Sequence, residues 1–168
     1  IAKALIHCHK QRIVHGDVKV DNVLVGDDGE PLLCDFGCAR VLHDNLFPNG
    51  QGTRINWAPE MFGERVTINE KIDVWGLGVI AYELLTGHMP FDAGGTVSDD
   101  DVVITHSLED RKLIMARVLS GKYIPPQKLN KNISEEAIDL ITTLFTFDPK
   151  QRPSLQHLLK THPFFLGK

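Results

Sequence analysis

The eight residues HGDVKVDN, at positions 15–22, bring two carboxylates, one lysine, one asparagine and one histidine into a single short segment. Side chains of these types can accept or donate a proton, and they can contact a phosphate group or a cation. A polar turn can have the same composition by chance. The segment is therefore a catalytic loop, the remains of one, or an ordinary turn, and the residues downstream must decide between these readings.

Two further motifs follow this segment in order. Asp35–Phe36–Gly37 comes after two β-like runs joined by a turn, and Ala58–Pro59–Glu60 closes the long loop behind it. Asp-Phe-Gly alone is common, but three motifs in this order and context are far more specific. The set resembles the signatures H-R-D-x-K-x-x-N, D-F-G and A-P-E of eukaryotic-type serine/threonine protein kinases. The tail of the chain is most similar to the calmodulin-dependent-kinase-like group.

This resemblance implies ATP-dependent phosphoryl transfer to Ser or Thr of protein substrates, a reaction that needs mainly positioning and charge neutralisation. Asp17 would accept the proton of the substrate hydroxyl. Asn22 and Asp35 would hold Mg²⁺ at the nucleotide, and Lys19 would lie near the γ-phosphate of ATP. Thr53 would tie the loop to Asp17 and Lys19 and shape the substrate site.

The resemblance also implies residues that line or stabilise the site without taking part in the reaction. Leu24 corresponds to the apolar floor under adenine. Asp73 corresponds to a buried aspartate that anchors the catalytic loop, and Glu60 and Arg152 correspond to an ion pair between A-P-E and the later helices. The structural residues implied in this way are His15, Phe36, Gly37, Glu60, Asp73 and Arg152.

Gly16 departs from the family pattern, because it stands where H-R-D has an arginine. In the family that arginine usually binds a phosphate on the activation loop through charge-assisted hydrogen bonds. Residues 38–57 contain no hydroxyl side chain except Thr53, which matches the family's structural threonine. The arginine that would bind the phosphate and a hydroxyl side chain that would carry it are therefore both absent. We therefore expect a non-RD catalytic loop whose activity does not depend on phosphorylation of this segment.

The elements that must position these residues begin with the end of an amphipathic helix, in the stretch before HKQR. An Asp28–Gly29 hairpin turn joins the second and third of three short β-like runs. Residues 38–57 have no periodicity and predict a long functional loop. The three predicted runs are 12–15, 22–26 and 31–36.

The rest of the chain is predicted to be helical. Residues 72–87 are apolar nearly all round and indicate a buried central helix closed by Gly87, whereas residues 94–110 read as a polar insertion. The expected fold is mainly α with a small β-hairpin region, a protein-kinase-like C-terminal lobe. Further helices are expected at 109–120, after the cap Ser134, and from Pro153 and Ser154.

Three other motifs suggest different chemistry and are weak. Gly76-x-Gly78-x-x-Ala81 fits a dinucleotide pattern, but its glycines lie inside a continuous helical pattern, where small residues permit close packing. Gly121–Lys122 lacks the preceding residues of a phosphate-binding loop. The adjacent residues of His7–Cys8–His9 point in different directions on a helix, which disfavours one metal ion.

Composition limits the class of protein. The 168 residues suffice for one domain with a core, and 42% apolar with 24% charged residues is an ordinary globular profile. The net charge of -4 disfavours a nucleic-acid partner. No apolar run approaches the roughly 20 residues of a membrane span, and no signal peptide is evident. Three cysteines without C-x-x-C indicate a reducing compartment, the cytoplasm or the nucleus.

The sequence contains no Gly-rich loop and no V-A-I-K lysine of the kinase N-terminal lobe. We therefore expect a partial kinase domain over 1–168 without that lobe, which would bind ATP weakly by itself and expose an apolar interface. Its expected parts are a catalytic loop at 15–22, a D-F-G and activation segment at 35–60 and a helical subdomain at 61–168.

Two functions remain open. In the first, the chain is part of a Ser/Thr kinase that uses ATP and Mg²⁺ and acts on a protein substrate, with an N-terminal lobe or another partner covering the exposed interface. In the second, it is a truncated, kinase-derived scaffold or interaction module without turnover of its own. The intact Asp17, Lys19, Asn22 and Asp35 favour the first reading, because a scaffold need not keep metal ligands.

Overall fold

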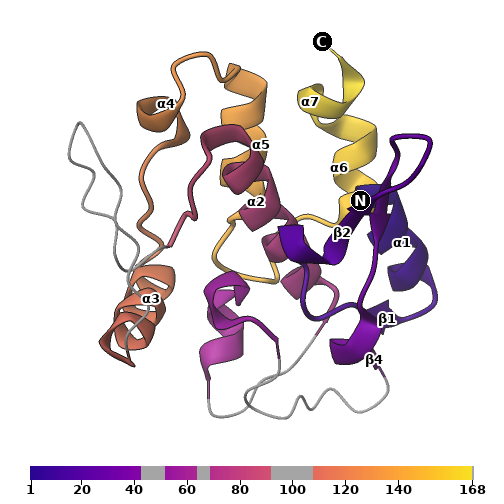
Figure 1. The fold of residues 1–168 in the computed structure, drawn as a ribbon, viewed down its shortest axis with the longest axis horizontal. Helices are drawn as coiled ribbons and strands as arrows, with labels where there is room; N and C mark the ends of the chain where they lie inside the picture. The colour runs from indigo at the N-terminus through magenta and orange to yellow at the C-terminus, as the bar shows by residue number, and fades with distance from the viewer. Residues whose placement is uncertain (43–51, 64–68, 92–107, 168) are drawn as a thin grey trace.

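The structure, a computed structural model, describes residues 1–42, 52–63, 69–91 and 108–167. Much of the predicted long loop and nearly all of the predicted polar insertion, with its run of aspartates, lie outside these residues. Helices dominate the described part, and two small sheets complete it (Figure 1). A mainly helical fold with a small β region was therefore correctly predicted.

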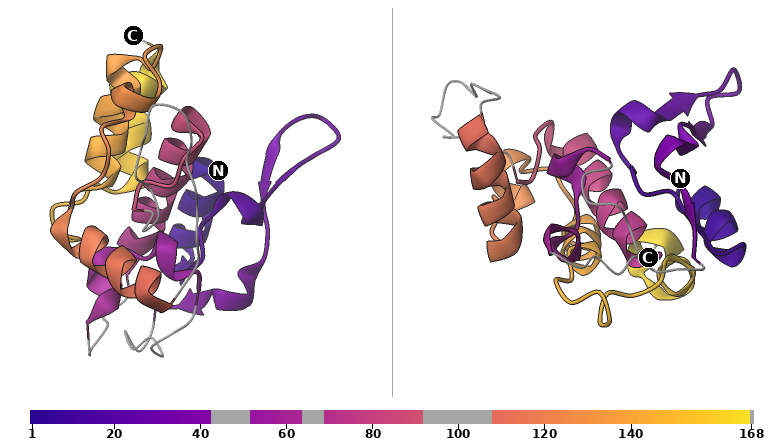
Figure 2. Two further views of the ribbon diagram at one scale, coloured as in Figure 1. Left: turned by 60° about the vertical axis from the view of Figure 1, so that its left-hand side comes forward. Right: turned by 90° about the horizontal axis from the view of Figure 1, so that it is seen from below.

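The N-terminal third contains the helix α1 (Ala2–Lys10) and four short strands. The two outer strands pair antiparallel with each other, as do the two inner strands, which form the predicted hairpin. This hairpin projects from the helical body (Figure 2). The strands are β1 (Ile13–Val14), β2 (Val23–Val25), β3 (Pro31–Leu33) and β4 (Arg40–Val41).

Two predictions for this region were wrong. The third predicted run, 31–36, ends as a strand at Leu33, because Asp35 has left-handed backbone (φ 58°, ψ 76°), which breaks a strand ladder. The predicted loop 38–57 contains a strand, β4, which pairs with β1. It also contains a 3-10 turn, η3 (Arg54–Asn56). The other 3-10 turns among the described residues are η1 (Val20–Asn22), η2 (Phe36–Cys38) and η4 (Pro59–Phe62).

The helix α2 (Lys71–Thr86) is the centre of the fold, as predicted for residues 72–87. One side contributes Trp75 and Val79 to a first hydrophobic cluster, and the other contributes Val74 and Ile80 to a second. Burial of both sides explains why its sequence is apolar nearly all round. Gly87 ends the helix in a left-handed conformation (φ 75°), and its N–H donates to the carbonyl of Glu83.

The glycines of the dinucleotide-like pattern lie within α2 and allow close packing. A Cβ atom at Gly76 would lie 2.8 Å from the Cβ of Val18 and 3.0 Å from its carbonyl oxygen. One at Gly78 would lie 2.9 Å from the ring of Phe145. Since Val18 follows Asp17 directly, the absent side chain at Gly76 allows the 15–22 segment to rest on α2.

Gly76→Ala should destabilise the protein. Overpacking against backbone costs about 1–3 kcal/mol, which exceeds the gain of about 1 kcal/mol in helix propensity. Urea unfolding of the variant would measure the difference. Ala116→Gly, on the exposed face of α3, isolates the propensity effect. A Gly76→Ala variant more stable than the parent would contradict this prediction and show that Val18 can move aside at little cost.

The C-terminal helices follow the predicted signals at their starts. Ser134 accepts a hydrogen bond from the N–H of Ala137 (3.2 Å), and Ser154 accepts one from the N–H of His157 (3.2 Å). Two short helical turns, α4 and α7, were not predicted. The helices after α2 are α3 (Leu108–Ser120), α4 (Pro126–Leu129), α5 (Glu135–Leu144), α6 (Leu155–Thr161) and α7 (Pro163–Leu166).

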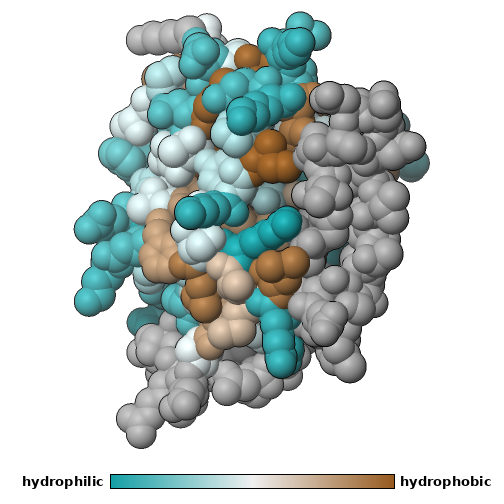
Figure 3. All heavy atoms as spheres, turned by 90° about the vertical axis from the view of Figure 1, so that its left-hand side faces the viewer, coloured by the Kyte–Doolittle hydropathy of each residue, from teal (hydrophilic) through white to brown (hydrophobic). Residues whose placement is uncertain are grey.

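The helix α3 stands at one side of the molecule (Figure 1). Its residues Ile114 and Val118 are buried, whereas Leu113, Met115 and Leu119 are partly exposed. The face of the molecule on this side carries hydrophobic residues beside hydrophilic ones (Figure 3). Among the described residues, no helix is both long and apolar enough to cross a bilayer.

Candidate active site

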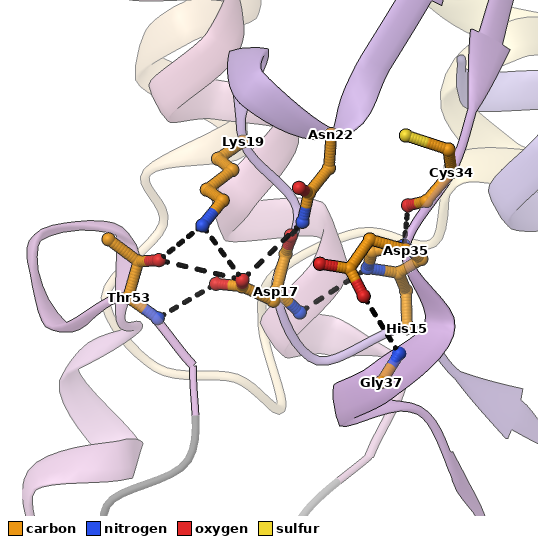
Figure 4. Close-up of polar contacts among 8 residues, drawn as sticks. All are labelled: His15, Asp17, Lys19, Asn22, Cys34, Asp35, Gly37 and Thr53. Carbon is orange, nitrogen blue, oxygen red and sulfur yellow. Dashed lines mark hydrogen bonds and ion pairs between the residues drawn. The ribbon is translucent and has the colours of Figure 1, made fainter.

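Asp17 is the centre of a cluster of polar contacts (Figure 4). One carboxylate oxygen accepts a hydrogen bond from the backbone N–H of Thr53 at 2.8 Å. The other lies 3.1 Å from the ammonium of Lys19, which also donates to the hydroxyl of Thr53 at 2.8 Å. The side-chain amide of Asn22 donates to the Asp17 carbonyl at 2.8 Å. The structure thus places four of the predicted site residues together.

The Asp17 carboxylate is only 9% exposed and remains charged. Burial raises its pKa, but the Thr53 N–H and the Lys19 ammonium together outweigh burial, so the net pKa lies below the ordinary value of a carboxyl group. At neutral pH the side chain is therefore a carboxylate, able to accept a hydrogen bond or a proton from a hydroxyl group nearby.

Asp73, on α2, holds the backbone just before Asp17. Its two carboxylate oxygens accept the N–H groups of His15 and Gly16, each at 2.9 Å. One oxygen also lies 2.8 Å from Nε2 of His9, on α1. Because Asp73 is 1% exposed, these three donors supply the compensation that a buried carboxylate needs.

Gly16 has left-handed backbone (φ 79°), a conformation that glycine adopts without steric cost. Its contact with Asp73 uses the backbone N–H, which any residue except proline supplies. The missing arginine side chain thus leaves the anchoring of the loop intact. Residues 43–51 of the predicted activation loop lie outside the described residues, and independence from phosphorylation there stays a prediction.

His15 connects the loop to the Asp35–Phe36–Gly37 motif. Its Nε2 lies 3.0 Å from the carbonyl oxygen of Cys34, and its Nδ1 accepts the N–H of Asp17 at 3.3 Å. In this arrangement Nε2 faces a carbonyl acceptor and Nδ1 faces an N–H donor. The ring also meets Phe36 edge-on, with centroids 4.9 Å apart. The imidazole therefore sets the spacing between the two motifs.

Asp35 has the left-handed backbone already described, which is uncommon for a residue other than glycine and clusters at functional sites. One of its oxygens accepts the N–H of Gly37 at 3.1 Å, and its carboxylate projects toward Asp17 and Asn22 (Figure 4). Since the amide nitrogen of Asn22 is engaged with Asp17, its Oδ1 is the atom available to a cation. A carboxylate and an amide oxygen are ligands that Mg²⁺ accepts.

Leu24 lies on β2 with 55% of its surface exposed. Val25 and Leu32, on the same hairpin, are also exposed, as is Phe36. Leu24 and Leu32 are cross-strand partners on one face of the hairpin, whereas Val25 points to the opposite face. We call the exposed apolar face formed by Leu24 and Leu32 the hairpin surface. A ligand or a protein segment could cover it, and the described residues do not.

Glu60 and Arg152 form a bidentate ion pair, with N–O distances of 2.8 and 3.1 Å. The guanidinium also donates to the carbonyl oxygens of Lys71, Thr146 and Phe147. All five N–H groups of Arg152 are therefore satisfied. The pair joins the Ala58–Pro59–Glu60 segment to α2 and to the residues before α6.

The sequence did not reveal His9, which was considered only as part of the metal-like triplet His7–Cys8–His9. It contacts Asp73, whereas His7 pairs with Gln11. Among the described residues, no group of three or more His, Cys, Asp or Glu side chains is arranged to hold a metal ion. Periodicity places His9 on the same side of α1 as Leu5, and that signal could have identified it as facing the interior.

Comparison with known proteins identifies similar sequences. The family model for the protein kinase domain matches residues 1–165. The chain is 37% identical to sperm motility kinase 2B of Mus musculus, across 98% of this chain and 30% of that protein. It is 38% identical to an Aurora kinase of Candida glabrata, across 99% of this chain and 41% of that protein.

A third relative is the carbon catabolite-derepressing protein kinase of Secale cereale, 32% identical across 100% of this chain and 30% of that protein. The chain spans less than half the length of these relatives. Their names do not single out the calmodulin-dependent-kinase-like group, so that finer assignment stays a prediction.

Proposed function

The chain belongs to the protein kinase family, as a eukaryotic-type kinase domain, and from this premise we propose that it transfers the γ-phosphoryl group of ATP to Ser or Thr of protein substrates as part of a complete kinase domain. The observation that carries the proposal is the Asp17 cluster. A charged carboxylate, fixed by Thr53 and Lys19, lies beside a possible cation site.

The residues of the cluster have separate tasks in this proposal. Asp17 accepts the hydrogen of the substrate hydroxyl and aims its oxygen at the phosphorus. Lys19, which is already bound to Asp17 and Thr53, places positive charge where the transferred group becomes more anionic. Thr53 fixes both through its backbone and its hydroxyl, so that little reorganisation is needed during the reaction.

Asn22 and Asp35 would hold Mg²⁺, which neutralises phosphate charge when it is bound with ATP. The chain's own contribution there is orientation. The amide nitrogen of Asn22 is anchored on the Asp17 carbonyl, and the N–H of Gly37 fixes Asp35. Leu24, on the hairpin surface, would lie under the adenine ring.

We propose that residues 1–168 form the C-terminal lobe of the domain. Their parts are the catalytic loop at 15–22, the segment 35–60 and the helical subdomain 61–168. The hairpin surface supports this division, because its apolar side chains are exposed, as expected for a face that another lobe covers. An N-terminal lobe would complete the nucleotide site.

The hairpin surface also favours a second candidate function. A kinase-derived scaffold would use exposed apolar side chains to bind a partner without turnover. The two functions differ in what they require of Asp35. A scaffold has no need of its carboxylate, whereas phosphoryl transfer loses a metal ligand without it.

Calorimetry of Mg²⁺-dependent ATP binding tests the proposal, with Asp35→Asn as the variant. We expect weak binding by the chain itself and at least tenfold weaker binding by Asp35→Asn, because a neutral amide is a poorer ligand for a hard cation. Asp27→Asn removes an exposed carboxylate from the hairpin turn and should leave binding unchanged.

A kinase assay then uses a chimera in which the N-terminal lobe of a protein kinase is fused ahead of Ile1. Phosphorylation of a Ser/Thr protein substrate by the chimera, and its loss in Asp35→Asn, would support the kinase function. Absence of ATP binding and of turnover in every protein would overturn it and favour the scaffold.

A further inference from the structure

Arg54 is an exposed residue next to the proposed reaction centre. It begins the 3-10 turn η3 and directly follows Thr53, whose N–H binds the Asp17 carboxylate at 2.8 Å. Adjacent Cα atoms are about 3.8 Å apart. The backbone of Arg54 is therefore tied to Asp17 by one residue and one hydrogen bond.

The guanidinium of Arg54 is held on the ring of Trp57, with 5.4 Å between its central carbon and the ring centroid. Trp57 is itself buried and packs against Phe62, with centroids 5.4 Å apart. Its Nε1 lies 3.4 Å from where a Cβ of Gly52 would be, and that same Cβ would lie 3.4 Å from the Asp17 carboxylate. The ring that carries the cation is thus part of the wall beside Asp17.

Arg54 forms no ion pair with any carboxylate among the described residues. This contrasts with Lys19, which is bound to Asp17, and with Arg152, which is bound to Glu60. Stacking on the ring restricts the Arg54 side chain while its N–H edge stays available to an anion. The site therefore presents an ordered cation to whatever approaches Asp17.

We infer that Arg54 selects protein substrates that carry an Asp or Glu close to the accepting Ser or Thr; this inference rests on the proposed kinase function. An extended peptide advances about 3.3–3.6 Å per residue. Side chains within two positions of the hydroxyl bound at Asp17 therefore lie about 7 Å away along the chain, which is within reach of an arginine at position 54. A carboxylate there pairs with the guanidinium in a bidentate geometry.

The test uses the chimera with a supplied N-terminal lobe and a set of peptides. Each peptide has a single Thr acceptor and one Asp, Ala or Lys at one of the three positions on either side. The measured quantity is the ratio of kcat/KM for the Asp and Lys peptides at each position. We expect a ratio of about five or more at one position within two residues of Thr, since a charge pair at a partly exposed site has that strength.

Arg54→Glu should invert that ratio in favour of Lys, and retained turnover of the Lys peptide would show that the variant is folded. Lys128→Glu makes the same change of charge at an exposed residue of α4, away from the catalytic loop (Figure 1), and should leave the ratio unchanged. Equal kcat/KM for the Asp and Lys peptides, or a ratio that Arg54→Glu leaves intact, would overturn the role of Arg54 and leave the proposed kinase function standing. No phosphorylation of any peptide would overturn the kinase function and this inference with it.

Discussion

Asp17→Asn in the chimera with a supplied N-terminal lobe is expected to lower kcat by about 10²–10⁴-fold, the range for loss of a positioned general base. Asparagine can still accept the N–H of Thr53 through its side-chain oxygen, so the loop should keep its conformation. It has no charge to attract a hydroxyl hydrogen and cannot take up the proton. Steady-state phosphorylation of a protein substrate would measure the loss.

The same variant should bind ATP with nearly unchanged affinity, because Asp17 is not one of the residues expected to contact the nucleotide or its metal ion. ATP binding measured by calorimetry distinguishes a folded but inactive variant from a misfolded one, because a misfolded variant would also lose ATP binding. Asp27→Asn, an isosteric change at an exposed carboxylate of the hairpin turn, should leave kcat unchanged. If Asp17→Asn retained full turnover, the carboxylate would have no part in the reaction, and the proposed mechanism would be wrong.

The lowered pKa of Asp17 limits what kind of base it can be. Burial alone would raise that pKa, but the contacts with Thr53 and Lys19 reverse the effect. A carboxylate held in this state is a weak base, and it cannot remove a hydroxyl proton early. In a loose phosphoryl-transfer transition state, the hydroxyl becomes acidic only late. Orientation of the hydroxyl therefore accounts for most of the expected effect.

The sequence predicted correctly those features that depend only on residues close together in the chain. Ser134 and Ser154 begin helices because their side chains bond to the backbone three residues later. Gly87 ends α2 because a left-handed residue is required there. The hairpin turn at Asp28–Gly29 is equally local, with Gly29 at φ 81°. Such signals lie within one turn of chain and need no tertiary context.

The missed features depend on residues far apart in the sequence. The strand β4 exists because it pairs with β1. Next to this pairing, the N–H of Leu42 donates to the carbonyl of Arg12, whose guanidinium donates to the Leu42 carbonyl. The end of the third predicted strand has a similar origin. Asp35 leaves the extended conformation where the segment meets the His15 ring through Cys34 and Phe36. No periodicity within 31–42 encodes either contact.

The candidate site shows the same division. Motif spacing predicted which residues would do chemistry, and the structure brings Asp17, Lys19, Asn22 and Thr53 together in one cluster of polar contacts. The pattern did not reveal His9, because its partner Asp73 is 64 positions away. The residues proposed to act directly were selected by their type and order, whereas the contact between His9 and Asp73 depends on packing.

Arg152→Ala is expected to lower the free energy of unfolding by about 3–5 kcal/mol, the cost of breaking a buried ion pair from one side. Arg152 is 0% exposed. Its loss leaves the Glu60 carboxylate without its cation and removes one hydrogen-bond donor from each of three backbone carbonyls. It also removes a guanidinium stacked on Trp75 at 5.0 Å. Urea unfolding of the chain would measure the change, with Lys128→Ala on α4 as an exposed control.

Glu60→Gln tests whether the charge or the hydrogen bonds matter more. Glutamine keeps one acceptor for Arg152 but leaves the buried guanidinium without a counter-ion. We therefore expect a substantial loss in the free energy of unfolding, but a smaller one than with Arg152→Ala. In the double variant the two effects should not add, because each single change already disrupts the same pair. Additive losses would mean that Glu60 and Arg152 stabilise the protein independently. The non-additive result would identify the pair as a connection between the Ala58–Pro59–Glu60 segment and the helices behind it.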